Sequence, residues 1–227
     1  MKDQQPQFNL EPVKAFYTKH LQKYAEGDIR TMGWHDQKEY CIRFGVMTAF
    51  ADLKNHSLLD VGCGIGGLYD YLKDKGTSVQ YHGVDIMPQM IERARKKYPH
   101  STVQHSNFAT HQPATDPSFP APTFEVCNIL TQDVPHYDYV FCIGALNIES
   151  DNFHEFFMSM LNKMISIAHK GVGINFLCNK DRLCAGPYHF ENPLELKKEL
   201  EHKYNVRVVV DNEESLIAEC CLFIYKE

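Results

Sequence analysis

A glycine-rich segment, 60–67 (DVGCGIGG), holds the residues whose types and spacing best suit ligand chemistry. It follows a short apolar run, 57–61 (SLLDV), that predicts a buried strand, and it leads into a helical pattern over 67–75. Glycines at such a turn let the backbone turn sharply and approach a ligand closely. The segment also fits the G-x-G-x-x-G pattern of dinucleotide-binding folds through Gly62, Gly64 and Gly67. We therefore expect a nucleotide-containing ligand, and a dinucleotide is one alternative.

Two carboxylates near this turn narrow the choice of ligand. Asp85 ends a second predicted strand, 79–85, about 20 residues further on, where a carboxylate can accept both hydroxyls of an adenosine ribose. This position suits NAD and S-adenosylmethionine equally well. Asp60 stands two residues before the first glycine, where dinucleotide enzymes usually carry a small apolar residue. The pattern predicts an adenosyl cofactor and favours S-adenosylmethionine.

An alternation of strands and helices must position these residues. After two helical segments, 11–24 and 37–50, the pattern predicts helices over 67–75, 88–98, 152–169 and 193–203, and strands over 57–61, 79–85, 138–144, 171–178, 205–210 and 217–225. This order predicts βαβ units and a largely parallel sheet, and hence a doubly wound α/β fold. The last two strands are joined by a short polar stretch and are expected to pair antiparallel. Segment 99–123, which is rich in proline, is expected to be an insertion.

Three segments carry a resemblance to a known family. LLDVGCGIGGL (58–68) and YHGVDIMPQMIERARKKYP (81–99) resemble the first two motifs of class I S-adenosylmethionine-dependent methyltransferases, and DYVFCIGALN (138–147) resembles their fourth strand. GWHDQKEYCIRF (33–44) is similar to a segment that precedes the first motif in a bacterial subgroup. The resemblance covers nearly the whole chain after residue 55. It implies a Rossmann-like, seven-stranded, mostly parallel sheet of order 3-2-1-4-5-7-6, and methyl transfer by in-line displacement.

The resemblance also implies roles for single residues. Asp60 would interact with the methionyl amino group, Asp85 would hold the ribose, and Ile86 would flank the adenine. The family usually places an Asp after the third strand, but this chain offers Ser106-Asn107-Phe108 or Cys127-Asn128-Ile129 instead. We favour the second because it leaves a shorter connection to the next strand. The predicted cofactor-binding residues are Asp60, Gly62, Cys63, Gly64, Asp85, Ile86, Asn128, Ile129, Ile143, Gly144 and Trp34.

The loop around Trp34 can close over the cofactor, with Trp34 or Arg30 near its methionine end, or Trp34 can simply pack on the sheet edge. Arg43 is a surface ion pair or a partner of the cofactor carboxylate. Ligands of open α/β sheets bind beyond the carboxyl ends of the strands. The predicted substrate-binding residues are therefore Asn147, Tyr188 and His189, although a surface loop histidine is the simpler interpretation of the last. No catalytic residue is assigned, because a base is needed only if the acceptor must lose a proton.

Composition bounds the function further. The 227 residues carry a net charge of −6, and no basic stripe indicates nucleic-acid binding. We therefore expect a small-molecule acceptor; the alternatives are an RNA or protein methyltransferase, an NAD(P)-dependent oxidoreductase, and an inactive binding protein. The polar start of the chain and the lack of a long apolar run favour a cytoplasmic protein without a membrane segment. The eight scattered cysteines are expected to be reduced, and no histidine spacing predicts a metal site. Residues 1–55 are expected to form a helical lid on a methyltransferase domain, 56–227, with 99–123 contributing to the lid in a single compact unit.

Overall fold

The computed structural model describes residues 8–99, 119–178, 186–211, 216 and 218–226. Within them lies a seven-stranded sheet of order β3-β2-β1-β4-β5-β7-β6. Its first five strands are parallel, and β7 runs antiparallel to both of its neighbours. The predicted strand order and C-terminal antiparallel pair are therefore confirmed. The strands are β1 (Ser57–Val61), β2 (Gln80–Asp85), β3 (Thr123–Val126), β4 (Tyr137–Ile143), β5 (Ala168–Leu177), β6 (Val206–Asp211) and β7 (Glu219–Lys226).

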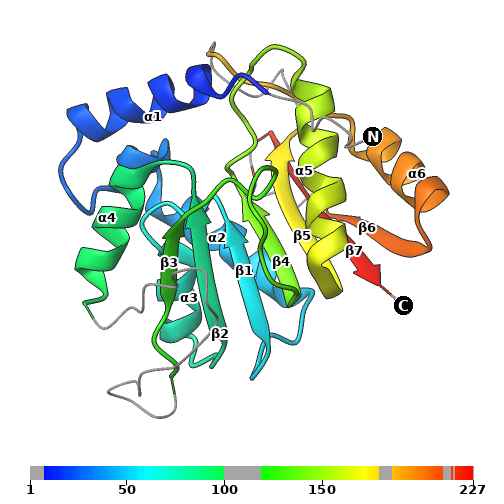
Figure 1. Ribbon diagram of the computed structural model, residues 1–227, viewed down its shortest axis with the longest axis horizontal. Helices are drawn as coiled ribbons and strands as arrows, with labels where there is room; N and C mark the ends of the chain where they lie inside the picture. The colour runs from blue at the N-terminus through cyan, green and yellow to red at the C-terminus, as the bar shows by residue number, and fades with distance from the viewer. Residues whose placement is uncertain (1–7, 100–118, 179–185, 212–215, 217, 227) are drawn as a thin grey trace.

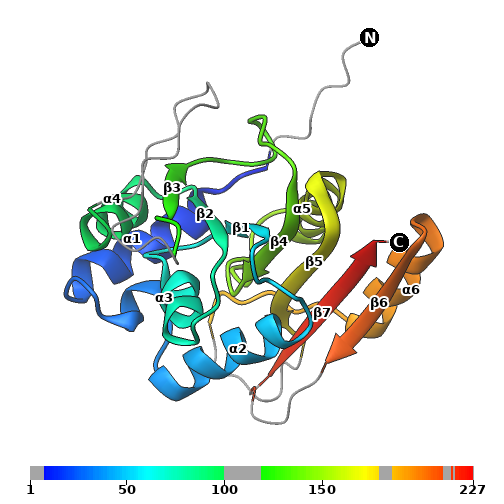
Figure 2. The same cartoon turned by 90° about the horizontal axis from the view of Figure 1, so that it is seen from below.

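Helices cover both faces of this sheet, as a doubly wound fold requires (Figures 1 and 2). The helices are α1 (Glu11–Lys23), α2 (Gln37–Ala49), α3 (Gly67–Asp74), α4 (Pro88–Lys97), α5 (Phe153–Ile167) and α6 (Pro193–Lys203), with a short 3-10 helix η1 (Ile29–Met32). Side chains of α2, α3 and α4 form one apolar cluster with the sheet, and those of α5 and α6 form another. Helix α1 belongs to neither layer: it crosses the edge where the parallel strands end (Figure 1).

The alternation of side chains along β1 explains the two clusters. Leu58 packs into the cluster of α2, α3 and α4, whereas Leu59 and Val61 pack into the cluster of α5 and α6. Asp60 is 3% exposed and lies at the same strand end. A carboxylate in such a position is costly unless a ligand or a hydrogen-bond donor meets it. Strand β1 therefore contributes apolar side chains to the core and a buried carboxylate near its own carboxyl end.

Several predicted boundaries differ from those in the structure. The helix expected over 152–169 ends at Ile167, because Ala168 begins β5 and pairs with Tyr137 of β4. The insertion expected over 99–123 includes Thr123, which begins β3 and pairs with His82. Residues 100–118 lie outside the described residues.

The expectation of reduced cysteines is also wrong for one pair. Cys178 and Cys220 form a disulfide. The sequence separates them by 42 residues, but β5 and β7 are hydrogen-bonded neighbours, and Phe176 is paired with Cys220. Five other cysteines of the described chain are not in disulfides, and Cys184 lies outside it. In the same described part, no helix is long and apolar enough to cross a membrane.

Candidate functional site

A cavity lies at the carboxyl ends of the central parallel strands. It contains about 1070 Å³ of space not filled by protein atoms. Residues at the ends of β1, β2, β3 and β4 line it from the sheet, and residues of α1, α2 and α5 line it from the helices. Ligands of open α/β sheets bind in this position. Every residue predicted to bind the cofactor lines this one cavity.

The glycine-rich turn forms its floor with geometry that only glycine fits. Gly62 and Gly64 have φ values of +75° and +54°, in the left-handed region that other residues rarely adopt. A Cβ on Gly62 would lie 2.2 Å from the Cβ of Ala145, and one on Gly64 would lie 2.8 Å from the Sδ of Met32. The turn therefore exposes backbone, rather than side chain, to whatever occupies the cavity.

Asp85 is fixed at the end of β2 by the turn itself. Its Oδ2 accepts a hydrogen bond from the N–H of Gly64 at 3.0 Å, and its Oδ1 accepts one from the N–H of Met87 at 2.8 Å. Burial raises the pKa of the carboxyl to about 6, although backbone hydrogen bonds, including one with Ile86, oppose the shift. Each oxygen retains a lone pair that can accept a further hydrogen bond. The side chain suits a ligand with two neighbouring hydroxyls.

Asp60 provides a second carboxylate in the same cavity. Its Oδ2 accepts a hydrogen bond from the hydroxyl of Tyr81 at 2.5 Å. Burial raises its pKa to about 7, against the effect of the Tyr81 hydrogen bond, and the charge of Asp85 raises it further. A cationic ligand group would favour the ionised form. The pair thus forms an acidic site that suits a positively charged ligand.

Trp34 closes the cavity above the end of β4. Its ring lies over Gly144, where an added Cβ would be 2.2 Å from Cζ2 of the indole. Trp34 lines the cavity rather than only packing on the sheet edge, and its contact with a cofactor stays a prediction. The guanidinium of Arg43 lies 4.1 Å from the centre of the indole ring, and this cation–π contact stabilises the position of the ring.

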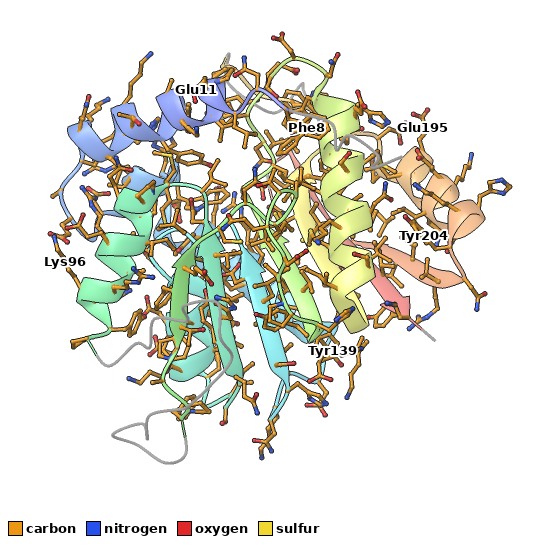
Figure 3. All side chains as sticks on the ribbon, in the orientation of Figure 1. Phe8, Glu11, Lys96, Tyr139, Glu195 and Tyr204 are labelled. Carbon is orange, nitrogen blue, oxygen red and sulfur yellow. A yellow bond between two sulfur atoms is a disulfide. The ribbon has the colours of Figure 1, made fainter. Side chains whose placement is uncertain are left out.

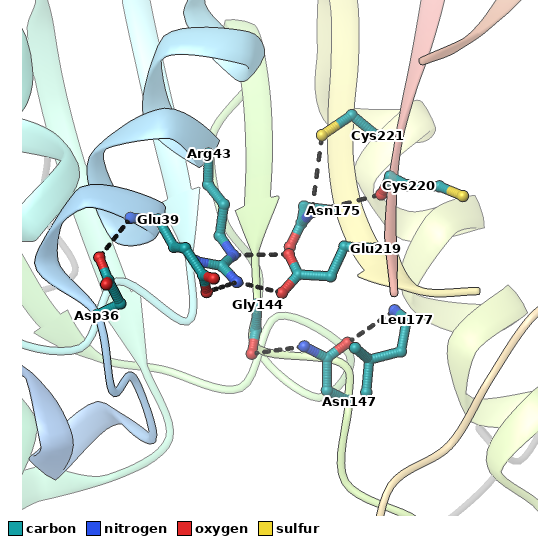
Figure 4. Close-up of polar contacts among 10 residues, drawn as sticks. All are labelled: Asp36, Glu39, Arg43, Gly144, Asn147, Asn175, Leu177, Glu219, Cys220 and Cys221. Carbon is teal, nitrogen blue, oxygen red and sulfur yellow. Dashed lines mark hydrogen bonds and ion pairs between the residues drawn. The ribbon is translucent and has the colours of Figure 1, made fainter. Parts of the chain in front are cut away.

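Arg43 itself is not a surface residue. It is 4% exposed and forms a two-point ion pair with Glu219, in which Nε donates to Oε2 at 2.6 Å and Nη2 donates to Oε1 (Figure 4). Glu39 lies 3.7 Å from the same Nη2. Because Arg43 is buried, the surface interpretation is wrong. Arg43 does not line the cavity, and its guanidinium already has carboxylate partners, so a contact with the cofactor carboxylate stays a prediction. Arg30 also lies outside the cavity lining, paired with Asp28 on the surface.

The segment after β3 is the one favoured from sequence. Cys127, Asn128 and Ile129 directly follow β3 and line the cavity. The Oδ1 of Asn128 accepts a hydrogen bond from the N–H of Leu130 at 3.0 Å, so a ligand amine would share that oxygen. The other candidate segment, 106–108, lies outside the described residues.

The three residues predicted to bind the acceptor have other partners and do not line the cavity. Asn147 joins two strand ends: its Nδ2 donates to the carbonyl of Gly144 at 3.4 Å, and its Oδ1 accepts from the N–H of Leu177 at 3.3 Å (Figure 4). Tyr188 forms an isolated antiparallel bridge with Ile148. Their role toward an acceptor stays a prediction.

His189 forms hydrogen bonds with Glu149 through Nδ1 and with Glu191 through Nε2, both at 2.8 Å. Burial opposes the charged ring, but these two hydrogen bonds outweigh it and raise the pKa of His189. The pKa of Glu191 is lowered, because hydrogen bonds with His189 and His154 outweigh its burial. A histidine held between two carboxylates is poorly suited to accept a proton from a ligand. Its role toward an acceptor likewise stays a prediction.

Sequence reasoning missed the remaining wall of the cavity. An apolar part of the wall comes from Leu10 just before α1, from α1 itself, from Leu146 and from α5. These residues are Leu10, Val13, Tyr17, Leu146, Phe153, Phe156 and Met160. The helical spacing of α1 and α5 can be read from the sequence. The sequence does not show that the apolar face of each helix borders a cavity. Among the described residues, no group of three His, Cys, Asp or Glu side chains could hold a metal ion.

Comparisons with known proteins agree with this geometry. Residues 59–162 match the model of a family described as a methyltransferase domain. Over 42 residues, the chain is 40% identical to Rv1506c of Mycobacterium tuberculosis (strain ATCC 25618 / H37Rv), whose name assigns it to the methyltransferases. This match covers 18% of this chain and 25% of that protein, so the chain spans about a quarter of the length of the curated relative it matches.

Solved structures share the fold over nearly the full chain. Magnesium protoporphyrin IX methyltransferase from Synechocystis PCC 6803, with bound S-adenosylmethionine, superposes with a TM-score of 0.58 at 18% identity, covering 96% of this chain and 93% of that chain. The CcbJ methyltransferase from Streptomyces caelestis superposes with a TM-score of 0.61 at 13% identity, covering 86% and 99%. At these identities the likeness shows a common fold.

Proposed function

We propose that this chain, which carries a class I S-adenosylmethionine-dependent methyltransferase domain with a Rossmann-like fold, transfers a methyl group to a small-molecule acceptor. The family and the cofactor are those that the sequence predicts. The small-molecule acceptor and the roles of single residues belong to the proposal.

The charges and polarity of the residues that line the cavity support the choice of a small-molecule acceptor. Within the described part of the chain, no Lys, Arg or His lines it, and its two charged residues are Asp60 and Asp85. Binding of RNA or DNA depends on cations that neutralise phosphates. A site with two carboxylates and otherwise mostly apolar walls therefore favours a small molecule over a nucleic acid.

The residues of the cavity fit the cofactor. Asp85 has lone pairs for the two ribose hydroxyls, and Asp60 presents a negative charge to the methionyl amino group. The glycine backbone of 62–64 leaves room for the methionyl chain, and Ile143, Gly144 and Trp34 would enclose it from the side of β4. Ile86, Asn128 and Ile129 would contact the adenine.

The chain's contribution to methyl transfer is alignment and exclusion of water. When bound, the cofactor supplies a methyl group on a positively charged sulfur, which an acceptor atom attacks in line. Asp60 and Asp85 fix its two ends, so the methyl group is held in one direction. Trp34 and α1 cover the cavity and keep water from competing with the acceptor. We also propose that residues 1–55 act as a lid on the domain formed by 56–227.

Calorimetric titration tests the proposal. Wild-type protein should bind S-adenosylmethionine and S-adenosylhomocysteine at micromolar concentration. Asp85→Ala should lose that binding, whereas Asp74→Ala, which removes an exposed carboxylate at the end of α3, should retain it. Methyl transfer from labelled cofactor to a panel of small acceptors should follow in the wild type. Binding of NADH alone would overturn the assignment, and cofactor binding with transfer only to RNA or protein would overturn the acceptor class.

A further inference from the structure

One wall of the cavity is apolar and comes from two helices that the cofactor assignment does not use. Leu10 and Val13 of the α1 segment, Phe153, Phe156 and Met160 of α5, and Leu146 line it together. Phe8 extends the contact, because its ring centre lies 5.2 Å from that of Phe156 (Figure 3). The wall is preformed: Phe153, Phe156 and Met160 are all less than 9% exposed.

The charges around the cavity exclude an ionised occupant of this wall. The cationic side chains of the described chain lie elsewhere, and Arg43 is already paired with Glu219. An anionic acceptor would be buried beside Asp60 and Asp85 with no cationic side chain of the described chain to pair with it, which is unfavourable. A cationic acceptor would compete with the cofactor for the same two carboxylates.

The wall also offers little hydrogen bonding. Among the residues that the α1 segment, α5 and Leu146 bring to the cavity, Tyr17 is the one with a polar side-chain group. Burial, with smaller effects of Asp85 and Cys142, raises the pKa of Tyr17, so the phenol stays protonated and can donate one hydrogen bond. The wall therefore matches a molecule with few polar atoms.

We infer that the methyl acceptor is an uncharged molecule with a mainly hydrocarbon or aromatic body, which packs against the wall formed by α1, α5 and Leu146. This inference rests on the proposed function, since it takes the strand ends of the cavity as the cofactor site. Apolar surface removed from water in such a pocket supplies the binding energy, and the few polar groups fix orientation.

A pair of fluorescent probes that differ by one charge tests the inference. N-phenyl-1-naphthylamine is neutral, and 1-anilinonaphthalene-8-sulfonate carries the same rings with a sulfonate. Each is titrated into protein saturated with S-adenosylhomocysteine. The neutral probe is expected to bind at least about tenfold more tightly than the sulfonate, because no described residue that lines the cavity carries a positive charge to meet the anion.

Two matched variants locate the bound probe. Val13→Glu places a carboxylate on the wall, and Ala15→Glu places one on the exposed face of the same helix. Val13→Glu should weaken the neutral probe at least about tenfold, and Ala15→Glu should not. Leu10→Glu, at a partly exposed wall position, repeats the test at lower risk to folding, which the melting temperature of each variant monitors.

The outcomes separate the two proposals. Loss of S-adenosylhomocysteine binding in the wild type would refute the proposed function and this inference with it. Normal S-adenosylhomocysteine binding with equal or tighter binding of the sulfonate would refute the inference alone. So would displacement of the neutral probe by S-adenosylhomocysteine, or a Val13→Glu variant that weakens both ligands equally, because the wall would then belong to the cofactor.

Discussion

The buried pair of Arg43 and Glu219 gives the sharpest quantitative prediction. Both side chains are 4% exposed, and they join α2 to β7 across 176 positions of the sequence. Arg43→Met keeps an apolar stem against Trp34 but leaves Glu219 buried without its main partner. Breaking a buried pair in this way costs about 3–5 kcal/mol. For a domain of this size each kcal/mol lowers the melting temperature by about 2–4 °C, so a decrease of roughly 6–20 °C is expected.

The double variant Arg43→Met/Glu219→Met separates pairing from packing. It removes both charges and fills the site with apolar volume, so it should be more stable than Arg43→Met alone. Urea unfolding of the four proteins of this cycle, followed by circular dichroism, measures the coupling. The chain has one tryptophan, so the fluorescence of Trp34 reports independently on the site that Arg43 supports.

The coupling energy must favour the pair, and the double variant must lose less stability than the two single variants summed. If the losses simply add, the two side chains do not act as a pair. If Arg43→Met changes neither stability nor Trp34 emission, Arg43 does not form this buried pair in solution.

Four further outcomes are expected. Gly76 has a left-handed backbone with nothing within 4 Å of an added Cβ, so Gly76→Ala should lower the free energy of unfolding by about 1–2 kcal/mol. Gly62→Ala should lower it more, because its Cβ would also clash with Ala145. Equal losses in chemical unfolding would contradict the clash. S-adenosylhomocysteine should bind more weakly as the pH falls through about 7, because Asp60 then becomes neutral, and calorimetry of Asp60→Asn should show a flatter dependence. The raised pKa of His189 should stabilise the fold fully below about pH 6.5, with the contribution lost as the pH rises through the folded value; melting curves of His189→Gln should lack this decline. Cys178→Ser should lower stability by about 4 kcal/mol if loop closure dominates, and a reductant should then have no effect on the variant's melting temperature.

The residues that line the strand ends of the cavity could be picked out from sequence because their determinants are local. Gly62, Asp60 and Asp85 lie at strand ends, and each strand is readable from its own apolar run. Asn128 could be placed because a short connection to the next strand is more economical than a long one. The structure puts all of these residues around one cavity.

The rest depends on contacts between distant segments, which one sequence does not reveal. Tyr188 and His189 do follow a strand end, as expected, but their segment pairs with residues 148 and 149 instead of facing the cavity. Arg43 is a charged residue in a predicted helix, and such residues usually lie on the surface. It is buried because α2 packs on β7, where it pairs with Glu219. The apolar wall likewise depends on the angle at which α1 crosses the strand ends, which its helical pattern does not specify.

If cofactor and acceptor bind as proposed, the path of α1 over the cavity links their binding energetically. Val13 lines the apolar wall, whereas Tyr17, one turn later, packs with Ile86 and Met87 beside Asp85. A single helix therefore contributes to both of the proposed subsites, and a ligand that holds α1 in this position would prepare the other subsite. Binding of cofactor and acceptor should then be cooperative, and by reciprocity each should raise the affinity of the other by the same factor.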